Sequence, residues 1–346
     1  MVIQQGQRQS AVTHQQSVHD PDVLEVSLRP RRLDEYIGQS KLKRHLRIHA
    51  GAARAREEPL GHTLLHGPPG LGKTTLAYII AQEMSAQIRI TSGPAIEKPG
   101  DLASLLTSLQ KGDVLFVDEI HRLRPHLEEV LYGAMEDSVL DIMIGKGPSA
   151  RPVRLKLQPF TLVGATTKAG SMTAPLRDRF LHHFKLLFYE LEEMQQIIAR
   201  SAKILGVTID DGATKLLGQA SRATPRIANR LVRAVRDFAL VRKQDAVDQP
   251  CAEHALESLE IDHDGLDAMD RALLHVLVKD FNGNPVGLST LSAILAEEQG
   301  TIEDVYEPYL IQQGFIQRTP KGRIATQKAY KKVGVEIVQE TQMRIV

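Results

Sequence analysis

The chain has 346 residues, 42% of them hydrophobic, which is enough for two or three globular domains of about 100–200 residues each. Its formal net charge is only +1, so the composition as a whole does not indicate nucleic-acid binding, and any basic surface must be local. The single cysteine, Cys251, rules out an internal disulfide. An apolar run of about 18 residues and a signal peptide are both missing, so we expect a cytoplasmic protein without a membrane segment.

The N-terminal region is polar. Residues 1–22 repeat Gln, Ser and His and hold few large apolar groups, a composition that cannot offset the entropy of ordering, so we expect a disordered leader. Leu28-Arg29-Pro30 then opens a loop region, in which Arg29 either lies near a nucleotide pocket or is solvated. The apolar spacing of residues 41–56 predicts a surface helix that ends before Pro59.

A phosphate-binding loop comes next. Gly67-Pro68-Pro69-Gly70-Leu71-Gly72-Lys73-Thr74 matches the pattern G-x-x-x-x-G-K-[ST], and it lies between a strand that ends at His66 and an apolar helix. Glycines let the backbone N–H groups curl toward phosphate oxygens, and the positive end of the helix dipole faces the same place. The pattern predicts Lys73 at the β- and γ-phosphates of a nucleotide and Thr74 as a ligand of Mg²⁺.

Strands and helices alternate around this loop, which indicates a parallel sheet. Residues 87–91 alternate as a strand should, and residues 101–109 have helical spacing. A continuous apolar strand over residues 113–117 then ends in Asp118 and Glu119. In P-loop enzymes a carboxylate at that strand end completes the Mg²⁺ shell, which favours Asp118, and Glu119 is then free to orient or deprotonate the attacking water.

An inserted β-hairpin is predicted after the next helix, which spans residues 126–137. Residues 138–157 switch to strand-like alternation around Gly145-Lys146-Gly147-Pro148. Ile142, Met143 and Ile144 would be apolar at its tip. Because apolar groups are costly to expose, either a partner docks there or the hairpin packs on its own domain.

Two arginines follow a further buried strand. Residues 160–167 form that strand and end in polar residues placed to sense a γ-phosphate. Arg177 and Arg179 come next, just before an apolar segment. A planar, always protonated guanidinium is suited to stabilise a transferring phosphoryl group, and an exposed helical arginine is the alternative.

From Glu190 the pattern changes to helices without strands, over residues 191–204, 211–221 and 226–243. The last helix begins with Pro225, whose missing N–H costs nothing in a first turn. Arg226, Arg230 and Arg233 share one of its faces. Either some of them face a nucleotide, or they form a solvated or subunit-facing stripe.

The C-terminal segment predicts a winged helix. Three helices, over residues 266–279, 289–297 and 301–314, precede two strands at 315–319 and 323–326. Residues 318–346 hold seven Lys or Arg against two Glu, a net charge of +5, so the basic patch lies here. A winged helix also serves as a protein contact in some proteins, and that alternative stays open.

Together these segments resemble the RuvB family of AAA+ motors, which drive branch migration of Holliday junctions in bacteria. The resemblance runs from about Leu28 to Gly334, and its motifs are residues 66–75, 118–123, 140–145, 164–167, 314–315 and 317–320. The first two motifs fit many AAA+ proteins, whereas the hairpin and wing motifs are specific. The resemblance implies an α/β fold with an AAA+ P-loop core containing a parallel sheet (23–189), a small helical lid (190–261) and a C-terminal winged helix (262–346).

The resemblance also implies roles for matching residues. Arg29 and Tyr189 would flank the nucleotide, Thr167 would act as sensor 1 and Arg226 as sensor 2, and Arg179 would be the finger that reaches a neighbour's ATP. Arg179 is preferred over Arg177 because an Arg-Phe pair is typical of AAA+ fingers, whereas Thr167 stands where AAA+ proteins often have Asn. The expected ATP-site set is Leu28, Arg29, Gly70, Gly72, Lys73, Thr74, Thr75, Glu136, Asp137, Ser138, Arg179, Tyr189 and Arg226.

Partners are implied in the same way. The chain would form a homohexameric ring around duplex DNA at Holliday junctions, with ATP and Mg²⁺ as cofactors. Arg318 and Arg323 would touch DNA, hairpin residues 141–148 would contact RuvA, and RuvC would join in a resolvasome. Residues 1–22 match nothing in the family.

Two other AAA+ functions share part of this pattern. A clamp-loader-like switch would have the same core and lid but would usually end in an oligomerisation collar. A protein unfoldase would carry an aromatic-apolar-Gly pore loop, which residues 92–96 match poorly. A nucleic-acid motor explains the core, the lid and the basic wing together.

Overall fold

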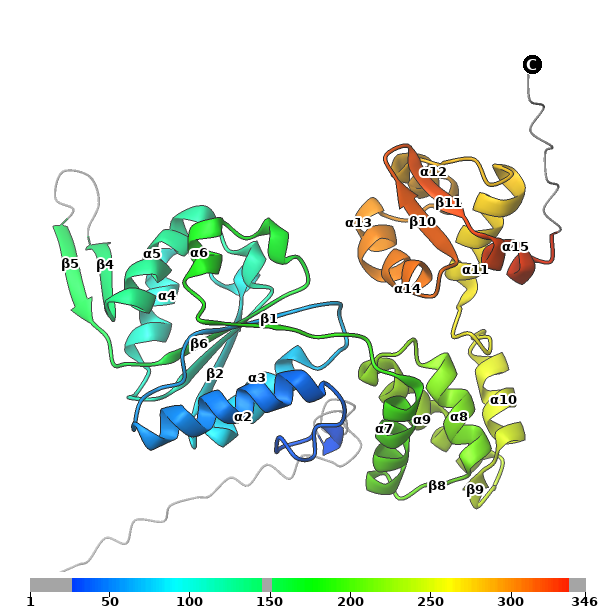
Figure 1. Cartoon of the computed structure of the whole chain (residues 1–346), viewed down its shortest axis with the longest axis horizontal. Coiled ribbons are helices and arrows are strands. Elements are labelled where there is room, and N and C mark those ends of the chain that lie inside the picture. Colours follow the sequence, from blue (N-terminus) through cyan, green and yellow to red (C-terminus); the bar gives the residue numbers. More distant parts are fainter. Residues whose placement is uncertain (1–26, 145–150, 336–346) are drawn as a thin grey trace, which may run out of the picture.

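Three bodies of secondary structure follow one another along the chain (Figure 1). The computed structural model describes residues 27–144 and 151–335, with the backbone alone at residues 142–144 and 152. An α/β core comes first, a helical lid second and a C-terminal domain third. The leader expected at residues 1–22 lies outside the described residues. Within the described ranges, every helix is too short or too polar to cross a membrane.

A five-stranded parallel sheet forms the centre of the core. Its strand order is β2-β3-β6-β1-β7, and each neighbouring pair is parallel. The strands are β1 (Thr63–His66), β2 (Ile88–Ser92), β3 (Val114–Asp118), β6 (Thr161–Thr166) and β7 (His182–Lys185). Because all five run the same way, the loops that follow β1, β3 and β6 meet at one edge of the sheet.

Helices cover both faces of this sheet. On one face lie α2 (Ser40–Ala55) and α3 (Lys73–Glu83), which supply Leu46 and Ile79 to a first apolar cluster. On the other face lie α4 (Pro99–Thr107), α5 (Pro125–Glu136) and α6 (Ala174–Asp178), which pack in a second cluster. Short 3₁₀ turns lie at Gly93–Ala95, Ile120–Arg122 and Ala169–Ser171. The layered arrangement confirms the α/β class predicted from the alternation of elements.

The predicted hairpin is present as two antiparallel strands, β4 (Val139–Ile144) and β5 (Arg151–Lys156). Leu140 and Leu157 at its base are buried in the second cluster, so the base packs on the core. In Figure 1 the two strands project from the side of the core that lies away from the lid. The docking expectation depends on the side chains of Ile142, Met143 and Ile144, which lie outside the described part.

The lid contains α7 (Leu191–Ile204), α8 (Asp211–Ala220), α9 (Pro225–Val241) and an unpredicted helix, α10 (Gln249–Ser258). The expectation of helices without strands is wrong, because β8 (Thr208–Ile209) pairs in parallel with β9 (Ala246–Val247). Two-residue strands are too short to show alternation in the sequence. Ile198 and Leu231 of the lid belong to the first core cluster, so lid and core share apolar packing.

The C-terminal domain has three helical segments and a two-stranded wing, which confirms the predicted winged helix. α11 (Ala268–His275) continues through a π-helical turn at Val276–Asp280, and α12 (Leu288–Leu295) follows. The third segment consists of α13 (Gln299–Thr301), a π-helical turn at Ile302–Tyr306 and α14 (Glu307–Gln312). The wing pairs β10 (Ile316–Thr319) with β11 (Gly322–Ala325), and an unpredicted helix, α15 (Gln327–Val333), comes after it.

Candidate functional site

The phosphate-binding loop connects β1 to α3. Gly67, Gly70 and Gly72 have φ values of 146°, 78° and 95°, in the range that side chains rarely adopt. At Gly67 a Cβ would also lie 2.5 Å from the carbonyl oxygen of Leu186. Lys73 Nζ donates to the carbonyl oxygens of Gly67 and Pro68, at 2.8 Å each. The loop therefore curls around its own lysine at the start of α3.

A pocket opens beside this loop, between the core and the lid. Twelve of the residues predicted for the site line it: Leu28, Arg29, Gly70, Gly72, Lys73, Thr74, Thr75, Asp118, Glu119, Thr167, Tyr189 and Arg226. The lid contributes further lining residues that the sequence did not indicate, among them Ile197, Arg200, Ser201 and Asn229. The loops after β1, β3 and β6 thus meet the lid helices around one cavity.

Two carboxylates stand at the end of β3. Asp118 is its last residue, and its Oδ1 accepts the N–H of Glu119 at 2.9 Å. Glu119 follows the strand with a left-handed φ of 47°, which is uncommon for a residue other than glycine. Its Oε2 accepts from Arg122 Nη1 at 2.9 Å. Asp118 therefore stays beside the phosphate loop, while Glu119 is held by an arginine.

The electrostatics of the pocket suit an anionic ligand. Burial lowers the pKa of Lys73 to about 8, although the nearby Asp118 opposes this shift. Thr74 and Asp118 supply hard oxygen donors, which Mg²⁺ prefers. Within the described ranges, groups of three or more His, Cys, Asp or Glu that could hold a metal by themselves are not found.

The end of β6 is organised around a buried threonine. Thr166 Oγ1 lies 2.9 Å from His121 Nδ1 and accepts the N–H of Lys168 at 2.9 Å. Thr167, the next residue, is exposed and lines the pocket. His121 was not predicted here, because it comes from the turn after β3, about 45 residues earlier in the chain.

Two tyrosines close the opposite end of the loop. The hydroxyls of Tyr36 and Tyr189 donate to the carbonyl oxygen of Leu71, at 3.2 and 3.3 Å. Burial raises the pKa of Tyr189 to about 12, so its phenol stays protonated even well above neutral pH. Arg200 of α7 fixes the chain at Leu28, which also lines the pocket, because its Nη1 donates to the carbonyl oxygen of Leu28 at 2.7 Å. Tyr36 and Arg200 belong to no motif, so neither residue could be predicted from the sequence.

The lid touches the phosphate loop directly. The backbone N–H of Arg226, in the first turn of α9, donates to the carbonyl oxygen of Gly70 at 3.3 Å. The Arg226 side chain lines the pocket, whereas Arg230 and Arg233 are not among the lining residues. Arg226 is therefore the member of this arginine stripe that lines the pocket, and a solvated or subunit-facing role for Arg230 and Arg233 stays a prediction.

Arg179 lies away from the pocket of its own chain. Its Nη2 is 3.1 Å from Glu136 Oε2, its Nη1 donates to the carbonyl oxygen of Pro175 at 2.8 Å, and its guanidinium lies over the ring of Tyr132. Glu136, Asp137 and Ser138 are also missing from the described lining of the pocket. These four predicted residues share a second surface, separate from the phosphate loop.

The two wing arginines differ sharply. Arg318 has a side chain that is 55% exposed and pairs with Glu303. Arg323 is only 8% exposed, and its guanidinium donates to Glu307 Oε1 and Oε2 at 2.5 and 3.2 Å. In this arrangement the guanidinium of Arg323 is buried and not presented on the surface, and the DNA contact expected of it stays a prediction. The reason for its burial is the buried carboxylate of α14, which takes up the guanidinium.

Three family models of known proteins match the core, the lid and the winged helix of this chain. The model "Holliday junction DNA helicase RuvB P-loop domain" matches residues 28–186, the "RuvB AAA lid domain" residues 189–262 and the "RuvB C-terminal winged helix domain" residues 263–334. Among solved structures, the RuvB Holliday junction branch migration motor of Thermotoga maritima is 48% identical, with a TM-score of 0.82 over 90% of this chain and 99% of that chain. A mutant of the same protein is also 48% identical, with a TM-score of 0.83 over 89% of this chain and 99% of that one. The chain belongs to the RuvB family of Holliday junction branch migration motors.

Proposed function

We propose that this chain hydrolyses ATP in the pocket between core and lid and uses the energy to drive duplex DNA through Holliday junctions. The observation that carries the proposal is the composition of that pocket. The phosphate loop, both carboxylates of β3, the polar end of β6 and the first turn of α9 all line it. Hydrolysis of the bound nucleotide would therefore change the contacts of core and lid at the same time. A motor requires such a link between its reaction and a movement of its domains.

Each residue of the pocket has a proposed task. Lys73 binds the β- and γ-phosphates, and Thr74 and Asp118 hold Mg²⁺, which when bound neutralises phosphate charge. Glu119 takes the proton of the attacking water, or orients that water. Thr167 senses the γ-phosphate from the core, and Arg226 does so from the lid. Arg29 and Tyr189 flank the nucleotide.

We propose that the site is completed by a second copy of the chain. Arg179 is the candidate finger, and it lies on a surface that is separate from the pocket of its own chain. Glu136, Asp137 and Ser138 lie at the end of α5, on the side of the core that carries Arg179. In a homohexameric ring around DNA, this surface of one subunit would face the pocket of the next. A cytoplasmic ring of this kind would meet RuvA through the β4–β5 hairpin and RuvC in a resolvasome.

Subunit mixing tests the composite site. Arg179→Ala and Lys73→Ala proteins should each be inactive, because a finger is worth about 10³–10⁵ in rate. A mixture of the two should recover part of the ATPase activity, since an intact finger can then meet an intact phosphate loop across an interface. Co-assembly is checked by size-exclusion chromatography with light scattering. A co-assembled mixture that stays as inactive as its parents would remove Arg179 from the neighbour's site.

A further inference from the structure

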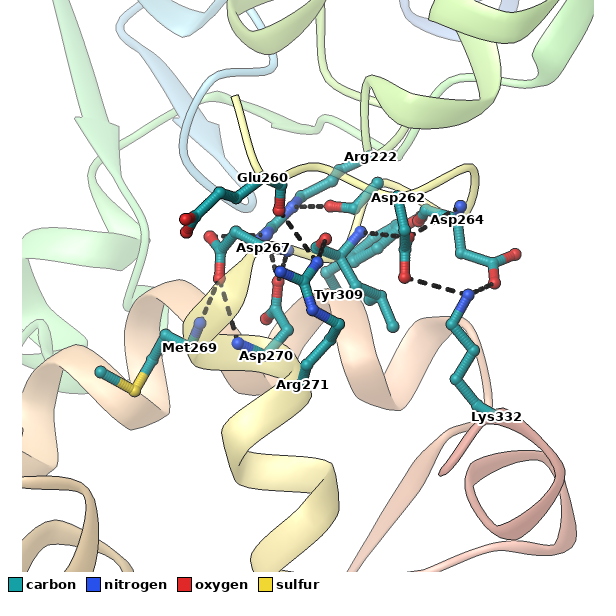
Figure 2. Close-up of polar contacts among 12 residues, drawn as sticks. Arg222, Glu260, Asp262, Asp264, Asp267, Met269, Asp270, Arg271, Tyr309 and Lys332 are labelled. Carbon is teal, nitrogen blue, oxygen red and sulfur yellow. Dashed lines mark hydrogen bonds and ion pairs between the residues drawn. The ribbon is translucent and has the colours of Figure 1, made fainter. Parts of the chain in front are cut away.

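A buried arginine joins the lid to the winged helix (Figure 2). Arg222 lies in the turn between α8 and α9, and its side chain is 11% exposed. Its Nε donates to the carbonyl oxygen of Gly265 at 2.8 Å, and its Nη2 donates to Asp267 Oδ2 at 2.8 Å and also to Asp270. Figure 2 shows both carboxylates turned toward this one guanidinium, with Tyr309 nearby.

Asp267 and Asp270, which pair with Arg222, also cap the first turn of α11. Asp267 accepts the N–H groups of Met269 and Asp270, and Asp270 accepts the N–H of Asp267 in return. Such reciprocal capping fixes the start of a helix. Arg222 therefore grips the winged helix at the point where its first helix begins, and a displacement of the guanidinium would move that helix.

A second set of contacts crosses the same junction in the opposite direction. Arg271, from α11, donates to the carbonyl oxygen of Glu260 at 2.9 Å, and Lys332, from α15, reaches Asp262 Oδ2 at 3.0 Å and also Asp264. These contacts involve the linker between α10 and α11, residues 259–267. At Gly265 in this linker a Cβ would lie 2.6 Å from the carbonyl oxygen of Ala220, so the linker packs directly on the lid backbone. The linker is thus held from both sides.

The turn that carries Arg222 also borders the nucleotide pocket. Arg222 and Ala223 both have φ values of 53°, a strained conformation that persists only where the surroundings determine it. The carbonyl oxygen of Ala223 accepts the N–H of Tyr189 at 3.1 Å, and Arg226, four residues after Arg222, donates its N–H to Gly70. One short turn therefore touches both the phosphate loop and the winged helix.

The contact between winged helix and core is much weaker. Across the described ranges, a single ion pair joins these two parts, between Lys168 Nζ and Asp304 Oδ2 at 2.7 Å, and both of its side chains are 43% exposed. Exposed pairs contribute little to stability, whereas separating a buried, hydrogen-bonded pair leaves an uncompensated charge. If lid and core change their angle, the winged helix should follow the lid.

We propose that Arg222 is a positioning residue that makes the lid and the winged helix a single lever, so that a nucleotide-driven rotation of the lid moves the DNA-holding domain with it. The proposal rests on the proposed function, because it takes the pocket to be the source of the motion. It adds the residue through which that motion passes from the pocket to the domain that grips DNA.

Distance measurements on spin-labelled protein test the lever directly. In a Cys251→Ser background, labels at the exposed positions Lys215→Cys and Gln327→Cys report the lid-to-wing distance, and labels at Lys215→Cys and Gln82→Cys report the lid-to-core distance. Labelled subunits are diluted with unlabelled ones to suppress distances between subunits. Between ADP and a slowly hydrolysed ATP analogue, the lid-to-core distance should shift while the lid-to-wing distance stays fixed. A lid-to-wing shift as large as the other, or no shift in either pair, would overturn the proposal.

A double variant tests the role of Arg222 in coupling. Arg222→Gln with Asp270→Asn removes both charges together, which avoids leaving one of them buried and unpaired. Basal ATPase and duplex affinity should persist, while the branch migration achieved per ATP hydrolysed should fall at least about fivefold, the lower end of typical coupling between sites. Asp304→Asn is the matched control, since it breaks only the exposed contact with the core and should leave this ratio unchanged.

The outcomes separate the two proposals. A wild-type protein without DNA-stimulated ATPase would refute the proposed function itself. A double variant that hydrolyses ATP, binds duplex DNA and migrates junctions at the wild-type ratio would refute only the lever. If the double variant fails to fold, the distance measurements on the otherwise wild-type chain decide the question alone.

Discussion

The guanidinium carbon of Arg179 lies 4.3 Å from the centre of the Tyr132 ring. The hydroxyl of the same tyrosine is 3.1 Å from Thr173 Oγ1, and Thr173 caps the N-terminus of α6 and also donates to the buried Glu128. Glu128, Tyr132 and Glu136 follow one another at four-residue spacing, so one face of α5 supports the whole segment that ends in Arg179. The candidate finger is therefore held in place before it meets any nucleotide.

Replacing Tyr132 should weaken hydrolysis without weakening ATP binding, since its ring is not among the residues that line the pocket. Tyr132→Leu removes the stacking, which is worth about 0.5–2 kcal/mol, and should lower the assembled turnover roughly 2- to 30-fold. Tyr132→Phe keeps the ring and should retain most activity. Turnover and equilibrium ATP affinity are measured on the same preparations. Equal losses in both variants would assign the effect to the hydroxyl and Thr173, and unchanged turnover in Tyr132→Leu would show that the stacking is irrelevant.

The core of the fold was predictable because its signals are local. The apolar runs of β1, β3 and β6 and the helical spacing between them indicate a parallel sheet without any knowledge of contacts. β7 escaped prediction because its four residues, His182–Lys185, are mostly polar, and only alternate ones are buried at the sheet edge. Strand order was not predictable either, because it depends on which crossovers pack and not on any one segment.

The residues of the site were predictable only where they belong to a local sequence motif. The phosphate loop and the carboxylates after β3 are encoded within a few residues, so their position in the pocket follows from the sequence. Tyr36 and Arg200 reach the pocket from distant segments and follow no pattern. The burial of Arg323 was equally hidden, because its partner Glu307 lies in another element, and charge counting alone places both wing arginines on a basic surface.

Glu119→Gln should separate ATP binding from hydrolysis. The carboxylate of Glu119 is paired with Arg122, while Lys73 approaches the loop carbonyls and Asp118, so binding does not require Glu119. A general base contributes typically 10²–10⁴-fold, and turnover should fall by about that factor. Affinity for ATP and turnover are compared on one preparation. Comparable losses of both would give Glu119 a role in binding or folding.

ATP affinity should depend on pH through Lys73. In the free protein the pKa of Lys73 is about 8, because burial disfavours its charged form. A bound triphosphate keeps the ammonium protonated, so above that pH binding must take up a proton, and affinity should fall by up to about tenfold per pH unit. The dissociation constant of a fluorescent ATP analogue is measured from about pH 7 to about pH 9.5.

The control for this effect is Lys73→Arg, whose guanidinium stays protonated throughout the range. Its affinity is expected to be lower, because the longer, planar group fits the loop poorly, but the slope against pH should be flat. A wild-type slope that is equally flat would contradict either the lowered pKa of Lys73 or its contact with the phosphates.

The two wing arginines should respond differently to removal, although they stand opposite each other in the hairpin. A motor that moves along arbitrary sequence must hold phosphates without reading bases. Arg318 is exposed and suited to this task, and its removal should lower the log–log salt slope of duplex binding by about 0.9 while basal ATPase survives. Glu303→Gln should have the opposite effect and strengthen duplex binding, because Glu303 occupies the guanidinium of Arg318.

Arg323→Ala should act through stability instead. It leaves the carboxylate of Glu307, 2% exposed, without its partner, and breaking a buried pair costs about 3–5 kcal/mol. The winged helix should therefore unfold at a lower temperature, and adding Glu307→Gln should restore much of the loss, because no buried charge then remains. Duplex affinity and salt slope are measured below that temperature, where Arg323→Ala should resemble the wild type. A slope lowered by Arg323→Ala in a folded domain would return Arg323 to the DNA surface, and unchanged affinity and slope in Arg318→Ala would indicate that this domain binds a protein.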